Sequence, residues 1–237
     1  VFVAEEYQPH EKEKFLNDVK VALPFNRNEP LFKHLLEMYN IHILFSHSNE
    51  SGASDDKVTV DTAFNARYRG RLLYGDEAKV SNYISYYMKQ FPELRTVIVN
   101  SDRYGGAGML GGGAAWTYRG NEHVSTHETA HAFAGLHDEY IYERDFCDNN
   151  VCYGDNYTQA YWSHYLTELP SPYCNDSYKN ESRCVWVNPS HGEGSWEEAV
   201  GWYGESSGTG RRPSYSGVMH YGGPFRKVGS EIWARAL

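Results

Sequence analysis

The sequence predicts a mixed α/β domain in which helices pack on a largely parallel sheet. Residues 1–4 and 96–100 are short apolar runs with the length and composition of buried strands. An amphipathic helix is expected between them, over residues 76–90, with four side chains directed inward: Val80, Ile84, Tyr87 and Met88. Because strand and helix alternate along the chain, we expect helices to cover the faces of one sheet.

Four further elements fit this order. A helix is predicted over residues 11–21, a second over 29–38, a strand over 41–45 and a terminal helix over about 230–237. The first of these helices carries an apolar stripe of three residues, Phe15, Leu16 and Val19. Such a stripe is typical of a helix that lies on a sheet.

Residues 104–113 are rich in glycine, and their glycines at positions 106, 108 and 111 match the G-x-G-x-x-G pattern of dinucleotide-binding loops. That pattern must lead directly into a helix, whereas residues 114–118 favour a strand, so we reject a dinucleotide site. We expect the mobile loop and this strand to form the upper wall of a substrate cleft instead. An edge strand there would pair with an extended peptide through backbone hydrogen bonds.

The charge and length of the chain exclude some classes of partner. The 237 residues include 22 Lys and Arg against 31 Asp and Glu, a formal net charge of −9, which argues against a nucleic-acid partner. No apolar run approaches the ~20 residues of a transmembrane helix. The chain is long enough to bury its own core, and we expect a monomer.

Cysteines and glycosylation sequons cluster in one segment. The four cysteines are Cys147, Cys152, Cys174 and Cys184, and the four sequon asparagines are Asn49, Asn156, Asn175 and Asn180. Together they favour an extracellular protein with two disulfides, in a mature form from which a leader has been removed. The acidic stretch 145–155 suggests Ca²⁺, but it contains no recognised calcium motif.

The most informative stretch begins His127-Glu128-Thr129-Ala130-His131. Two histidines four residues apart project from one face of a helix, so their imidazoles can converge on one metal ion. Glu128 lies at the edge of that face, where its carboxylate can accept a proton from metal-activated water. This is the H-E-x-x-H arrangement of zinc peptidases, and we expect Asn121 to cap its helix.

A third ligand is expected just after this helix. Gly135 favours a left-handed helix end that turns the chain back toward the metal. If the turn aims the side chain, the ligand is Asp138, three residues after the glycine. If the residue count of metzincins decides, H-E-x-x-H-x-x-G-x-x-H, the ligand is His137. We prefer Asp138 and keep His137 as the alternative.

Two later stretches bear on the same chemistry. Met219 lies where metzincins place a methionine turn beneath the metal, and Tyr221 and Arg212 are candidates for stabilising the oxyanion. Residues 204–208 match the G-x-S-x-G nucleophile elbow of serine hydrolases. We reject that match because an elbow leads into a helix, whereas residues 209–213 favour a loop.

These stretches together resemble the IgA-specific metalloendopeptidase family, whose signature is H-E-x-x-H-x-x-x-G-x-x-D-E-Y. The resemblance is sharpest over residues 127–140, includes residues 1–4 and 99–106, and continues at 212–214. It implies a zincin fold and implies that Asp138 is the third ligand. The chain departs from the family at 218–221, where members more often place cysteine and methionine. The resemblance does not carry over an immunoglobulin substrate.

We therefore predict one metallopeptidase domain over residues 1–237, with an upper subdomain to about residue 135 and an irregular, disulfide-stapled lower subdomain from about residue 136. Its function would be that of a secreted zinc endopeptidase that binds one catalytic Zn²⁺ and cleaves a peptide or protein substrate. Two alternatives remain open at this stage. One is a non-catalytic binding protein on a zincin scaffold, and the other is a zinc hydrolase of non-protein amides.

Overall fold

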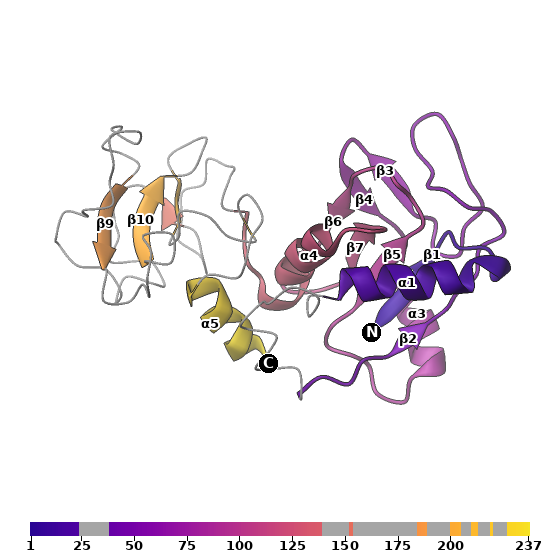
Figure 1. Cartoon of the computed structure of the whole chain (residues 1–237), viewed down its shortest axis with the longest axis horizontal. Helices are drawn as coiled ribbons and strands as arrows, with labels where there is room; N and C mark the ends of the chain where they lie inside the picture. The colour runs from indigo at the N-terminus through magenta and orange to yellow at the C-terminus, as the bar shows by residue number, and fades with distance from the viewer. Residues whose placement is uncertain are drawn as a thin grey trace. The chain divides into compact units, whose positions relative to one another are not determined.

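The computed structural model describes residues 1–23, 38–138, 152–153, 184–188, 200–204, 210–212, 219 and 227–237 (Figure 1). The chain divides into two compact units, Val1–Gly135 and Leu136–Leu237.

A mixed seven-stranded sheet forms the first unit, in the order β2-β1-β5-β7-β6-β4-β3. Its strands are β1 (Phe2–Glu5), β2 (Ile43–Leu44), β3 (Arg67–Arg69), β4 (Leu72–Tyr74), β5 (Thr96–Val99), β6 (Gly106–Ala107) and β7 (Ala115–Tyr118). The neighbouring strands β2, β1, β5 and β7 run parallel to one another. β6 is antiparallel to β7, and β3 is antiparallel to β4. The prediction of a mixed, largely parallel sheet is therefore confirmed.

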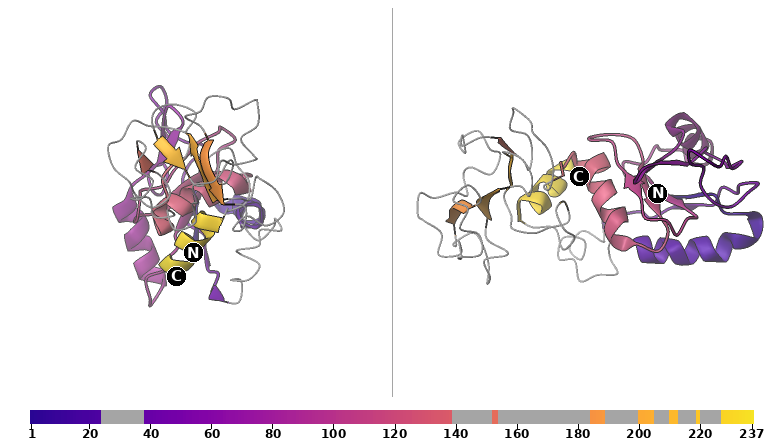
Figure 2. Two further views of the ribbon diagram at one scale, coloured as in Figure 1. Left: turned by 90° about the vertical axis from the view of Figure 1, so that its left-hand side faces the viewer. Right: turned by 90° about the horizontal axis from the view of Figure 1, so that it is seen from above.

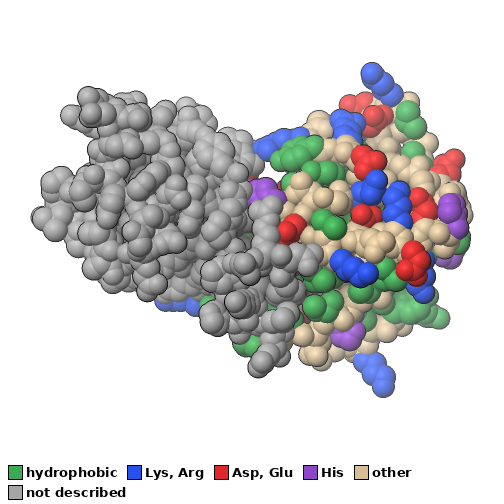
Figure 3. Space-filling view, in the orientation of Figure 1, with side chains coloured by type: hydrophobic (Ala, Val, Ile, Leu, Met, Phe, Trp, Pro, Cys, Tyr) green, Lys and Arg blue, Asp and Glu red, His purple; other side chains and the backbone are tan. Residues whose placement is uncertain are grey.

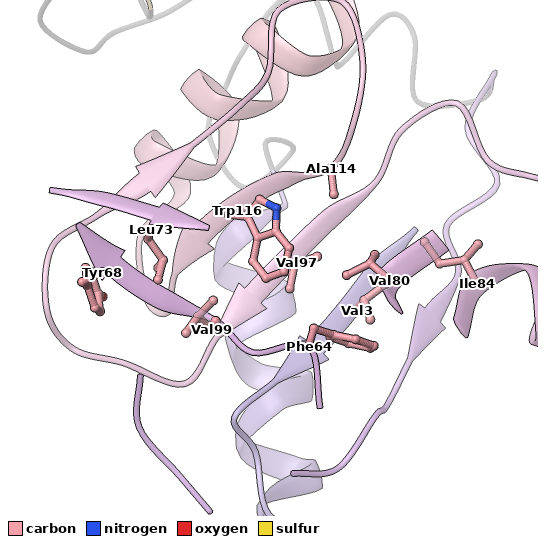
Figure 4. Close-up of a cluster of buried hydrophobic side chains, with 11 residues drawn as sticks. Val3, Phe64, Tyr68, Leu73, Val80, Ile84, Val97, Val99, Ala114 and Trp116 are labelled. Atoms are coloured by element: carbon pink, nitrogen blue, oxygen red, sulfur yellow. The ribbon is translucent and has the colours of Figure 1, made fainter. Parts of the chain in front are cut away.

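In the described part of this unit, three α-helices pack on the sheet: α1 (Lys12–Ala22), α3 (Glu77–Tyr87) and α4 (Glu122–Ala134). The short 3-10 helix η1 (Pro9–Glu11) leads into α1. Side chains alternate across β5, so that Val97 and Val99 face one core and Ile98 faces the other. α3 buries Val80 and Ile84 in the first core, with the Trp116 ring at its centre (Figure 4). α1 packs against the opposite face, where it lies beside α4 (Figure 2).

Most of the elements predicted for this unit are present. The helix over residues 11–21 is α1, and its stripe is buried at Phe15 and Val19. The strand predicted over residues 41–45 is shorter, because only Ile43 and Leu44 pair with β1. The helix predicted over residues 29–38 lies outside the described residues except for Met38.

The inward direction predicted for Tyr87 was wrong. Its side chain is 59 % exposed, and its ring packs beside those of Tyr83 and Tyr86, at centroid distances of 4.8 and 4.9 Å. The helix ends at Tyr87, and the chain then becomes extended at Met88, so the aromatic cluster forms at the end of α3 and not under it.

Among the described residues of the second unit, four strands form an antiparallel sheet in the order β8-β11-β10-β9, and one helix follows them. The elements are β8 (Cys152–Tyr153), β9 (Cys184–Asn188), β10 (Val200–Gly204), β11 (Gly210–Arg212) and α5 (Lys227–Ala236). α5 confirms the predicted terminal helix, and its Ile232 and Trp233 side chains are buried. The prediction of an irregular lower subdomain from about residue 136 was wrong at β8 and β9, which pair with the distant strands β11 and β10.

The surface of the first unit mixes both signs of charge. Figure 3 shows basic and acidic side chains interspersed on one face of the described part. Arg119, for example, lies between the carboxylates of Asp18 and Asp102, at N–O distances of 3.5 and 2.7 Å. In the part of the chain that the structure describes, no helix is both long and apolar enough to cross a membrane.

Candidate metal centre

The helix that carries the H-E-x-x-H residues is defined at both ends by its own sequence. At its start, the Asn121 side chain accepts a hydrogen bond from the Val124 amide at 2.9 Å, which confirms the predicted cap. At its end, Gly135 adopts the left-handed conformation, with φ +62°. A residue without a Cβ adopts this conformation at little cost, so the helix stops one turn after His131.

His127, Glu128 and His131 come together on one face of α4. Their potential ligand atoms all lie within 4.8 Å of one another. The two imidazole Nε2 atoms are 3.2 Å apart, and the rings are nearly perpendicular, at 86°. Two nitrogens bound to one tetrahedral Zn²⁺ at ~2.0–2.1 Å would be about 3.3 Å apart. Donor type and spacing therefore both fit a single divalent ion.

Burial differs among these three residues. His131 is buried, at 8 % exposed, whereas His127 and Glu128 are half-buried. A buried imidazole is held in one orientation by its surroundings, while the half-buried carboxylate can still meet a reactant from solvent. The arrangement can hold a metal and place a proton acceptor beside it.

The glycine-rich stretch packs directly on this helix. The Gly111 amide donates to the His131 carbonyl oxygen at 3.0 Å. A Cβ added to Gly108 would lie 2.2 Å from the Glu128 carbonyl oxygen, and one added to Gly106 would lie 2.7 Å from Glu128 Oε1. The absence of side chains at these two glycines is what allows the stretch to approach α4 so closely.

This close approach is a role that sequence reasoning missed. The signal available in the sequence was the two-residue spacing of the glycines at 106 and 108, which would place both on the same face of a strand. The rejection of a dinucleotide site is nevertheless supported, because the residues that follow form strand β7 and not a helix.

The prediction that residues 114–118 form an edge strand was wrong. β7 pairs with β5 on one side and with β6 on the other, so its backbone is not available to a peptide. The partner that covers it, Gly106–Ala107, comes from the stretch that was expected to be a mobile loop. Among the described strands of this sheet, β2 and β3 are the edges.

The two candidates for a third ligand belong to the second unit. His137 is buried, at 6 % exposed, and Asp138 is half-buried. The predicted left-handed turn at Gly135 that leads toward them is present. The assignment of Asp138, with His137 as the alternative, stays a prediction.

The remaining predicted site residues are only partly described. Met219 lies in a turn of the second unit and is 2 % exposed. Arg212 ends β11, while Cys152 and Cys184 begin β8 and β9. Asn49 is exposed, and its side-chain amide donates to Asp61 at 2.7 Å. Outside the described residues lie Tyr221, Cys147, Cys174, Asn156, Asn175 and Asn180, so the disulfides and the other three sequons stay predictions.

Residues 204–208 match the sequence of a serine nucleophile elbow, but the elements around them do not have the strand-then-helix order that an elbow requires. β10 does precede residues 205–209, as an elbow requires, but the next described element is strand β11. β11 returns antiparallel to β10. The loop expected over residues 209–213 is thus partly a strand, and the next described element after the motif is not the helix that an elbow requires.

Comparison with known proteins agrees with the geometry of the H-E-x-x-H helix. The chain has no match among curated proteins. The profile of a family described as IgA Peptidase M64 matches residues 1–186, a range that contains the whole seven-stranded sheet, α4 and both candidate third ligands. Because that match covers well over half of the sequence, the chain belongs to the IgA peptidase M64 family and is a peptidase.

Proposed function

We propose that this protein is a secreted zinc-dependent endopeptidase. His127 and His131 would bind the zinc ion, Asp138 would complete the protein ligands, and Glu128 would be the general base. The observation that carries the proposal is the 3.2 Å separation of the two imidazole Nε2 atoms, with the Glu128 carboxylate in the same cluster. Membership of a peptidase family supports the reaction class.

The chain's own residues account for the proton transfers. When bound, Zn²⁺ supplies a Lewis acid that lowers the pKa of water and polarises a carbonyl group. Glu128 accepts the proton of the attacking water and then donates it to the leaving amine. Because Glu128 follows His127 directly on α4, its carboxylate is carried by the same rigid element as the histidines.

We expect the glycine-rich stretch to help hold the substrate. Its backbone is tied to α4 at Gly111, yet Met109 and Leu110 are exposed, at 67 % and 48 %. Two large apolar side chains beside the metal helix suit contact with an apolar side chain of a peptide. Tyr221 and Arg212 are proposed to stabilise the oxyanion, and Met219 to pack beneath the metal.

The proposal that the protein is secreted rests on the clustering of its cysteines and glycosylation sequons. The exposure of Asn49 is compatible with glycosylation there. Mass spectrometry of the protein from a eukaryotic secretory host would test the four sequons and the pairing of the cysteines directly.

A protease assay with metal control tests the function. The purified protein should cleave casein, lose this activity after a chelator, and regain it with Zn²⁺. A protein that binds zinc but cleaves no protein substrate would favour a non-catalytic binding role, and cleavage of cell-wall amides alone would favour a hydrolase of non-protein amides. Elemental analysis that finds no metal would refute the zinc site itself.

A further inference from the structure

Two consecutive glutamates, Glu5 and Glu6, are completely buried at the carboxyl end of β1. Burying a carboxylate is costly unless a partner neutralises it. No ion pair among the described residues includes either side chain. These two acids take no part in the H-E-x-x-H cluster, so they need an explanation of their own.

The Glu5 carboxylate is held by backbone amides. It accepts hydrogen bonds from Phe64 at 3.0 and 3.1 Å and from Ala66 at 3.0 Å. These donors favour its ionised form and fix the chain over residues 64–66 around it. Burial nevertheless raises the pKa of Glu5, because the donors offset only part of the lost hydration.

Glu6 has no such support. Neither of its carboxylate oxygens has a hydrogen-bond partner among the described residues, and the same holds for the buried Thr62 hydroxyl. That hydroxyl lies close enough to Glu5 to lower its pKa. Burial, and then the negative charge of Glu5, raise the pKa of Glu6 to about 9. Both Glu6 carboxylate oxygens are therefore buried without hydrogen-bond partners within the electrostatic range of Glu5, and the Thr62 hydroxyl lies beside the Glu5 carboxylate.

A proton alone would not satisfy this group. A protonated Glu6 could donate to Glu5, but it would neutralise only one of the two carboxylates and would leave the second Glu6 oxygen and the Thr62 hydroxyl without hydrogen-bond partners. A hard divalent cation would occupy both Glu6 oxygens, use the second lone pairs of Glu5, and bind the Thr62 hydroxyl. It would also cancel the two neighbouring negative charges.

We propose that Glu5, Glu6 and Thr62 form a structural calcium site, separate from the zinc site and independent of catalysis. Ca²⁺ suits it better than Mg²⁺, because Ca²⁺ accepts irregular sets of oxygens whereas Mg²⁺ demands a near-ideal octahedron. The ion would fix the end of β1 against the chain that carries residues 62–66.

Calcium titration of the full-length protein, with zinc held constant, tests the site. The Tm should rise by about 5–10 °C at roughly one hundred times the dissociation constant. Glu6→Gln should abolish this rise, and Thr62→Val should weaken calcium binding at least ~10-fold. Glu13→Gln, which neutralises an exposed glutamate on α1, should behave as wild type.

A second readout does not depend on folding stability. Burial, and to a smaller extent the charge of Glu6, raise the pKa of Tyr68, so Tyr68 is within electrostatic range of the proposed site. Terbium bound at the site should therefore luminesce when tyrosine is excited, and calcium should quench this signal by displacement. A wild-type protein with no calcium-dependent Tm rise and no terbium signal would overturn the proposal. An unchanged response in both Glu6→Gln and Thr62→Val would do the same, and if Glu6→Gln fails to fold, Thr62→Val alone decides.

Discussion

The backbone amide of Gly111 donates a hydrogen bond to the carbonyl oxygen of His131, at 3.0 Å. His131 contributes its side chain to the proposed metal centre, and its carbonyl also accepts from the Gly135 amide at the end of α4. The glycine-rich stretch, α4 and the turn that leads to the two candidate third ligands thus meet at one residue. Displacing the stretch should disturb the metal centre.

Gly108→Ala should impair the protein more than Gly112→Ala. The new Cβ at position 108 would meet the Glu128 carbonyl oxygen at 2.2 Å, whereas nothing lies within 4 Å of one at position 112. We expect Gly108→Ala to cost about 1–3 kcal/mol in the free energy of unfolding and to lower kcat/KM. Urea denaturation and a fluorogenic peptide assay would measure both effects. Equal behaviour of the two variants would mean that the stretch does not need its close contact with α4.

Glu128→Gln should keep the metal and lose cleavage. A glutamine has the same shape but cannot accept the proton of the attacking water, so kcat should fall by about 10²–10⁴-fold. Glu122→Gln, in the first turn of the same helix, is the matched control and should leave kcat unchanged. Retained cleavage by a metal-loaded Glu128→Gln protein would remove Glu128 from the mechanism.

His131→Ala should remove the metal, whereas His123→Ala should not. His123 lies one turn before His127, with ring centroids 6.4 Å apart, compared with 4.7 Å between His127 and His131. Metal content after dialysis, measured by mass spectrometry, should therefore fall only in His131→Ala. Metal loss in His123→Ala instead would indicate that the pair 123 and 127 holds the ion.

In calcium-free buffer, Glu6 should make the protein less stable as the pH rises. Its pKa is raised in the folded state to about 9, from an ordinary value near 4.5, so the folded state binds the proton more tightly. The stabilisation is complete below about pH 4.5 and is lost as the pH rises toward 9.

The measurement is the difference in the free energy of unfolding between wild type and Glu6→Gln, from pH 5 to pH 9. This difference cancels the pH dependence of zinc binding. It should decline steadily without calcium and become nearly flat with saturating calcium. Parallel pH profiles for the two proteins without calcium would contradict the raised pKa.

Local sequence was enough to predict several elements of the fold and the core of the site. The cap at Asn121 and the left-handed end at Gly135 depend on short-range chemistry, so α4 could be delimited from its residues alone. Helical periodicity likewise placed Phe15, Val19, Val80 and Ile84 in the core. Because the two histidines are four residues apart, their side chains lie on the same face of the helix, wherever that helix packs in the fold.

Strand neighbours could not be predicted in the same way. Strand pairing depends on segments distant in the sequence, so nothing in residues 114–118 indicates that β6 covers them. β8 has two residues and β11 has the sequence Gly-Arg-Arg, so their local signals are weak and their pairing with each other and with β10 defines them as strands. A glycine pattern alone also does not reveal which helix the glycines approach.

The sequence by itself determined a helix with a candidate metal-binding face, its two ends and the class of chemistry to expect, because these follow from side-chain identity and the helical repeat. Only the tertiary structure decided that the glycine stretch lies on Glu128 and His131, that β7 is interior, and that Glu5 and Glu6 are buried together. Those relationships join residues far apart in the chain or depend on burial, which local patterns do not encode.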